Sequence, residues 1–160
     1  MRHLVITIGC EYGAKGNAIG RKIAEDLNIK FYNRELVDEI IEEVGIPKEI
    51  MENCVIIGRS ADYILKDSDK INLLRAFIYA PDDVRIHNIM ESHNLTEKDA
   101  RILLLEKDKR YHKRHLALTG SNRGDRHNRN ILIDSSYLGT EGTADYIEEL
   151  VRRKFGSGEE

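Results

Sequence analysis

Five short apolar runs, separated by stretches with helical periodicity, constrain the fold most strongly. The runs are "LVITIG" (4–9), "KFY" (30–32), "CVIIG" (54–58), "AFIYA" (76–80) and "ILID" (131–134). They are mostly continuous rather than alternating, which is typical of strands buried on both faces of a parallel sheet. We therefore predict an α/β fold with a five-stranded parallel sheet.

Helical patterns fill the stretches between these runs. The predicted helices span residues 17–27, 34–44, 82–93, 97–115 and 142–154. Their ends carry recognisable signals: Asn33 is a potential N-cap, Gly45 a C-terminal stop, and Thr96 with Asp99 forms a capping-box-like pair. Strand–helix alternation along the whole chain supports the parallel arrangement of the sheet.

The size and charge of the chain narrow its class. A chain of 160 residues with a net charge of −3 is expected to form one domain, residues 1–155, with a disordered tail at 156–160. No apolar run approaches the roughly 18 residues of a membrane span, and the N-terminus lacks a signal-peptide layout. Cys10 and Cys54 lie in or beside apolar runs, so we expect reduced thiols and a cytoplasmic protein.

The segment "GCEYGAKGN" (9–17) follows the first apolar run and precedes the first helix. A phosphate loop needs glycines that turn backbone N–H groups inward, a helix N-terminus and the spacing G-x-x-x-x-G-K-[ST]. Gly9 and Lys15 have that spacing, but Ala14 replaces the second glycine and Gly16-Asn17 the hydroxyl residue.

We expect this loop to bind the phosphates of a nucleotide, with Lys15 as the catalytic lysine. The expected phosphate-binding residues are Gly9, Gly13, Ala14, Lys15, Gly16 and Asn17. Asn17 occupies the position of the Mg²⁺-binding hydroxyl and would hold Mg²⁺ weakly, through water. The alternative is a tight strand–helix turn without a ligand.

Several segments, in order along nearly the whole chain, resemble the cytidylate kinase-like family. They are "ITIGCEYGAKGNAIGRKIAEDLNIKFYNRELV" (6–37), "CVIIGRSADYIL" (54–65), "LLRAFIYAPDDVRI" (73–86), "DKR" (108–110) and "IDSSYLGTEGTADYI" (133–147). The resemblance implies a three-layer α/β/α P-loop kinase-like fold and the use of ATP and Mg²⁺. It also implies transfer of the ATP γ-phosphate to a nucleoside monophosphate such as CMP.

The chain departs from the family pattern at three places. Cys10 stands where the family has arginine, and Lys15 stands where it generally has glycine. The link near residues 45–53 is shorter than the family's, in the region that corresponds to the flap that binds the monophosphate. A nucleotide-binding protein with weak or no catalysis, which has lost the acceptor flap, is therefore the alternative function.

The resemblance assigns further site residues. Arg59 would hold the acceptor phosphate and Asp62 would face the nucleoside; the alternative is a surface pair that caps a loop. Residues 106–130 contain eight lysines and arginines against three acidic residues, which fits a lid that closes over the donor phosphates. Arg110 and Arg114 are four residues apart, so both can point from one face of the helix. A solvated basic helix face is the alternative.

The expected partners are small nucleotides rather than a membrane or nucleic acid. The basic stretch includes only one aromatic residue, Tyr111, and no nucleic-acid-binding motif accompanies it, so nucleic-acid binding is the weakest reading. A homo-oligomer remains open, because a missing flap would expose sheet ends that a second copy can cover.

Overall fold

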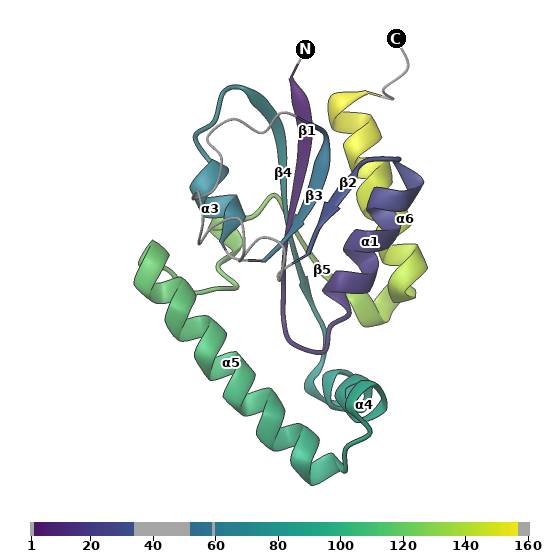
Figure 1. The fold of residues 1–160 in the computed structure, drawn as a ribbon, viewed down its shortest axis with the longest axis vertical. Coiled ribbons are helices and arrows are strands. Elements are labelled where there is room, and N and C mark those ends of the chain that lie inside the picture. Colours follow the sequence, from purple (N-terminus) through teal and green to yellow (C-terminus); the bar gives the residue numbers. More distant parts are fainter. Residues whose placement is uncertain (1, 34–51, 59, 157–160) are drawn as a thin grey trace.

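A five-stranded parallel sheet forms the centre of the computed structural model, which describes residues 2–33, 52–58 and 60–156 (Figure 1). The strands lie side by side in the order β2-β3-β1-β4-β5. Their bounds are β1 (His3–Cys10), β2 (Lys30–Tyr32), β3 (Cys54–Ile57), β4 (Ile71–Tyr79) and β5 (Ile131–Asp134). All four neighbouring pairs are parallel, which confirms the predicted sheet.

Helices cover both faces of this sheet. Figure 1 shows α1 (Gly16–Asp26) and α6 (Ser135–Phe155) together on one face and α3 (Ala61–Leu65) on the other. This is the predicted three-layer α/β/α arrangement. Figure 1 also shows α4 (Asp82–His93) and the long α5 (Glu97–Thr119) beyond the carboxyl ends of the strands. A 3₁₀ turn, η1 (Arg126–Asn128), leads from α5 into β5. None of the described helices is both long and apolar enough to cross a membrane.

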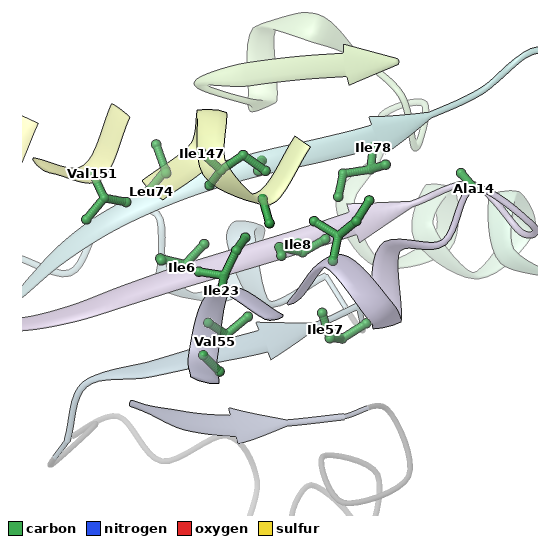
Figure 2. Close-up of a cluster of buried hydrophobic side chains, with 14 of the residues drawn as sticks. Ile6, Ile8, Ala14, Ile23, Val55, Ile57, Leu74, Ile78, Ile147 and Val151 are labelled. Carbon is green, nitrogen blue, oxygen red and sulfur yellow. The ribbon is translucent and has the colours of Figure 1, made fainter. Parts of the chain in front are cut away.

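The main core lies between the sheet and the α1–α6 layer (Figure 2). Ile6 and Ile8 of β1 meet Ile23 of α1 and Ile147 of α6, and each of these four side chains is at most 1% exposed. Burying one such side chain stabilises a fold by about 1.5–3 kcal/mol. This packing holds α1 firmly against β1, and it therefore fixes both ends of the loop that joins them.

The bounds of two elements differ from the predicted ones, in one case because of strand pairing and in the other because of a kink in a helix. β4 begins at Ile71 instead of residue 76, because its register with β1 runs from the His3–Ile71 pair to the Cys10–Ile78 pair. α6 begins at Ser135 instead of residue 142, with a kink at Gly139 (φ 74°). The short helix α3 was not predicted. The predicted helix at 34–44 and most of the link at 45–53 lie outside the described residues.

A buried carboxyl group connects the two helices on one face of the sheet. Glu148 of α6 is 5% exposed and lies near Asp26 of α1 and Asp145. Burial, then the hydrogen bond and the charge of Asp26, and then the charge of Asp145 raise the pKa of Glu148 to about 7, while Lys22 opposes the shift. The folded protein therefore keeps this proton over a pH range in which the unfolded chain has released it.

We expect Glu148→Gln to stabilise the protein above neutral pH. The pKa of Glu148 rises from its ordinary 4.5 to about 7 on folding, so wild-type stability falls as pH increases through that window. Glutamine does not titrate, so the free energy of unfolding of the variant should exceed that of wild type by about 1–3 kcal/mol at pH 8. Urea unfolding in chelator at pH 4.5 and pH 8 measures this, with the exposed Glu141→Gln as control. A stability difference that does not grow with pH would contradict the prediction.

Candidate functional site

The loop between β1 and α1 lies at the point where the direction of chain connections reverses. From β1 the chain continues to β2, whereas from β4 it continues to β5 on the opposite side of the sheet. In open α/β sheets, ligands bind outside the carboxyl ends of the strands at such a point. The N–H of Glu11 donates to the carbonyl of Ile78 at 2.9 Å, and Ala80 N–H donates to Glu11 Oε1 at 3.2 Å. These bonds anchor the loop to the end of β4.

Two residues of the loop, Gly13 and Lys15, have positive φ angles, which suit glycine but are unusual for lysine. Gly13 has φ 84°, and a Cβ there would lie 2.8 Å from the carbonyl oxygen of Arg85. Lys15 has φ 64° and ψ 26°, a left-handed conformation that costs an L-residue about 1–2 kcal/mol. Glycine avoids that cost, which accounts for the glycine typical of this position in the family that the sequence resembles. Strain of this kind is characteristic of functional positions.

A cleft of about 620 Å³ opens beside this loop. Its lining includes Gly13, Lys15, Gly16 and Asn17 from the loop and first turn of α1, and Asn88, Ser92 and His93 from α4. The first N–H groups of an α-helix lack intrahelical partners, and no described side chain caps α1. Those N–H groups and the Lys15 ammonium place positive potential at one wall of the cleft. The chemistry of this wall suits the phosphates of a nucleotide.

Two predicted loop residues have other structural roles. Ala14 is fully buried in the core, its N–H donates to the carbonyl of Glu11 at 3.1 Å, and its carbonyl accepts a bond from Ser135 Oγ at 2.7 Å. Gly9 lies against Arg129, where a Cβ would come within 2.8 Å of Nη1. Gly9 therefore makes room for an arginine, and Ala14 packs the loop onto the core.

A second, smaller cavity of about 40 Å³ lies between the ends of β1 and β3 and helix α5. Among the residues that the structure describes, three arginines and one carboxylate line it: Arg114, Arg123, Arg129 and Asp62. Arg129 is buried, with Nη1 3.1 Å from Asp62 Oδ2 and the guanidinium 5.1 Å from the centre of the Phe77 ring. The cavity therefore has an excess of positive charge.

The small cavity contains a buried arginine whose hydrogen-bonding capacity is not fully used. Among the described residues, Arg129 Nε has no hydrogen-bond acceptor, and Nη1 forms an ion pair with Asp62 without the geometry of a hydrogen bond, although the side chain is only 3% exposed. Burial lowers the pKa of Arg129, and Asp62 opposes that shift. Buried donors without acceptors are rare in folded proteins. An oxyanion in the cavity would supply both acceptors and negative charge.

The two cavities adjoin along the end of β1. Gly9 lines the small cavity and Cys10 lines the cleft. Arg123 donates a hydrogen bond to the carbonyl oxygen of Cys10, and Arg129 Nη2 donates to the carbonyl of Arg123 at 3.2 Å. Two successive residues of β1 therefore line the arginine-lined cavity and the lysine-lined cleft, respectively.

Arg110 and Arg114, which the sequence predicts on one face of a helix, have different surroundings in the structure. Arg114 and Asp62 both line the small cavity, whereas Arg110 is exposed and pairs with Glu106 at 3.3 Å, outside both linings. Arg59 lies outside the described residues. Arg129 was missed as a site residue, and its position two residues before the last apolar run was the available signal.

Arg85 was also missed, and it organises the loop from behind. This side chain of α4 is 2% exposed, and its Nε donates to the carbonyl of Tyr12 at 2.8 Å. Its Nη2 lies 2.6 Å from Asp108 of α5, and its Nη1 lies 3.3 Å from Asp82 and 3.6 Å from Glu11. One buried guanidinium thus joins the loop, α4 and α5. The acidic residue of the "DKR" segment is one of its partners.

Comparisons with known proteins agree with this architecture. A crystal structure of an uncharacterized protein from Eubacterium ventriosum ATCC 27560 superposes with a TM-score of 0.85, at 26% identity, over 96% of this chain and 100% of that one. Shikimate kinase from Acinetobacter baumannii, in complex with shikimate, superposes with a TM-score of 0.55 at 17% identity over 96% of each chain. The second likeness shows a shared kinase fold.

Sequence comparison identifies the family. A cytidylate kinase from Thermococcus sibiricus is 25% identical over 158 residues, which cover 92% of this chain and 80% of the relative. The sequence profile of the cytidylate kinase-like family matches residues 5–53 and 48–137, two segments that share residues 48–53 of this chain. Together these matches span most of the chain, including the loop between β1 and α1, helix α5 and all three arginines of the small cavity. The chain belongs to the cytidylate kinase-like family.

Proposed function

We propose that this protein is an ATP-dependent phosphotransferase that moves the γ-phosphate of ATP to a nucleoside monophosphate such as CMP. The observation that carries the proposal is the pair of adjoining cationic sites at the carboxyl edge of the sheet. Lys15 and the N-terminus of α1 line the cleft, and Arg114, Arg123 and Arg129 line the small cavity. Two phosphate-bearing substrates that react with each other need two such sites side by side.

In this proposal the cleft holds the donor. Lys15 neutralises charge on the β- and γ-phosphates, and the first-turn N–H groups of α1 bind their oxygens. Bound Mg²⁺ would supply further neutralisation of the phosphate charge, and the exposed Asn17 is the residue that would hold it, through water. Positioning and electrostatics account for most catalysis of phosphoryl transfer, so no nucleophilic side chain is required.

The small cavity holds the phosphate of the acceptor in this proposal. The Arg129 Nε group, which has no acceptor among the described residues, and the charge of Arg123 and Arg114 favour a dianion, and Asp62 keeps Arg129 in place. A dianionic monophosphate binds there better than an uncharged nucleoside, because only the dianion satisfies the buried donors.

An acceptor screen tests the proposal. ADP formation with Mg·ATP should rise several-fold when CMP, dCMP, UMP or AMP is added, and cytidine without a phosphate should have no such effect. Arg114→Gln should raise the KM for the acceptor about tenfold or more and leave the KM for ATP nearly unchanged. Arg101→Gln, on the same helix and paired with Glu97, is the matched control.

The outcomes separate this function from its alternative. Saturable ATP binding without acceptor-stimulated turnover across all four monophosphates would favour a nucleotide-binding protein without catalysis. Absence of an ATP-dependent shift in Tm at millimolar nucleotide would contradict both functions.

A further inference from the structure

His115 is a titratable side chain of the small cavity to which the proposed phosphotransfer assigns no role. It lies near the end of α5, is 5% exposed, and lines the cavity together with Arg114, Arg123 and Arg129. Histidine is the side chain whose ordinary pKa lets its charge change near neutral pH. A buried histidine at this position therefore adds a variable charge to a wall that is already cationic.

Ser60 holds the imidazole ring of His115 in place. Its Oγ lies 2.8 Å from Nδ1 of the ring, a contact that joins the start of α3 to the end of α5. Ser60 has φ 57° and ψ 29°, a left-handed backbone that is uncommon for serine and is characteristic of functional positions. A hydroxyl group both donates and accepts, so this bond persists whether the ring is neutral or protonated. Nε2 of the ring has no hydrogen-bond partner among the described residues, so the ring can take up a proton without losing a bond.

The surroundings of the ring keep His115 neutral at pH 7 when no anion is bound. Burial has the largest effect and lowers the pKa of His115, and Asp62 opposes this shift. The charges of Arg129, Arg123 and His112 lower the pKa further. A narrow pocket shares Asp62 and His115 with the small cavity. The other titratable or charged residues that the structure describes around these two spaces are Tyr63, Lys66, Arg75, Tyr111 and Arg114.

We propose that His115 couples anion binding in the small cavity to the uptake of one proton, so that a dianion binds more tightly as the pH falls from 8 to 6. Arginine side chains stay charged over this range, and among the residues that line the small cavity His115 is the histidine. A bound dianion favours the imidazolium, and a protonated ring raises the affinity for the dianion by the same factor. The inference rests on the proposed function, which places the acceptor phosphate in this cavity, and adds that pH regulates that binding.

Nuclear magnetic resonance titration of the six histidine rings tests this coupling in the full wild-type chain. Sulfate is the probe, because it remains a dianion from pH 8 to pH 6, whereas phosphate monoesters gain a proton near pH 6. Saturating Na₂SO₄ should raise the pKa of His115 by about one or more above its value in NaCl of equal ionic strength, since a nearby opposite charge shifts a pKa by about 1–3. The exposed His87, which pairs with Glu91, is the matched control and should change little.

Calorimetric titration with Na₂SO₄ measures the reciprocal effect. Wild type should bind sulfate about fivefold or more tightly at pH 6 than at pH 8. At pH 6 its binding enthalpy should depend on the ionisation enthalpy of the buffer, because a proton is taken up. His115→Gln should lose both effects and keep binding sulfate at pH 8. The exposed His112→Gln, on the same helix, should keep the tighter binding at pH 6.

Three outcomes would overturn the inference. A pKa of His115 that is the same in sulfate and chloride would exclude the coupling, and a rise confined to His93, which lines the cleft, would place the anion there instead. Tighter binding at pH 6 that persists in His115→Gln would assign the proton to another group. These measurements involve no nucleotide and no turnover. A positive sulfate result without acceptor-stimulated ADP formation would therefore contradict the proposed function alone, and turnover without the sulfate effect would contradict only this inference.

Discussion

Arg85→Met is expected to lower the free energy of unfolding by about 1–3 kcal/mol. The guanidinium is 2% exposed and faces Glu11, Asp82 and Asp108, with a further hydrogen bond to the carbonyl of Tyr12. Methionine fills a similar volume but leaves the Tyr12 carbonyl without its donor. The three carboxylates are 31%, 81% and 38% exposed, so water can solvate them, and most of the expected loss comes from the unpaired carbonyl and the lost hydrogen bonds.

Urea denaturation followed by circular dichroism measures this loss, with Arg101→Met on exposed α5 as the matched control. Asp108→Asn removes only one partner, which is 38% exposed, and should cost less than half as much. This milder variant keeps the prediction testable if Arg85→Met does not fold. A stability loss for Arg85→Met no larger than that of the Arg101 control would show that the network contributes little.

Lys15→Gly is expected to weaken ATP binding about 10–100-fold while leaving stability equal to wild type or about 1 kcal/mol higher. The lysine has a left-handed backbone with φ 64°, which glycine adopts without strain. The substitution therefore removes the ammonium without disturbing the loop. Lysine makes the unfolded chain less flexible than glycine does, and this entropic advantage of lysine offsets part of the stability that glycine gains from the relieved strain.

Calorimetric titration with Mg·ATP and urea denaturation together measure the two effects. Lys98→Ala, at an exposed position on α5, controls for the loss of one positive charge. A variant that binds ATP as well as wild type would show that Lys15 does not contact the phosphates. A variant that loses affinity and stability together would instead indicate a structural role for this side chain.

Local sequence pattern predicted most of the fold because the strands are short, apolar and separated by well-signalled helices. Helix α4 has the predicted bounds, residues 82–93, and β5 the predicted 131–134. The prediction failed where long-range pairing decides the outcome: Ile71–Arg75 has little strand pattern of its own and becomes extended by pairing with the first half of β1. Gly139 divides α6 at a kink that the helical periodicity of the sequence did not reveal.

The position of the loop between β1 and α1 was also predictable, because its signals lie within nine consecutive residues; its binding of phosphate stays a prediction. Spacing alone singled out Lys15 and the glycines, and the structure adds why glycine is typical at the Lys15 position: the backbone there is left-handed. The roles of Gly9 and Ala14 were not readable, since both depend on what packs against them, namely Arg129 and the core.

The sequence by itself thus determined the parallel sheet, most of the described helices, the loop between β1 and α1 and the family, all of which depend on neighbouring residues or on ordered motifs. Only the tertiary structure decided which carboxylate each buried arginine meets. Arg85 joins Asp108, and Arg129 joins Asp62, across long separations in the chain. The strand order brings these elements to one edge of the sheet, and burial then makes each pairing obligatory, since an isolated charge in that environment is costly.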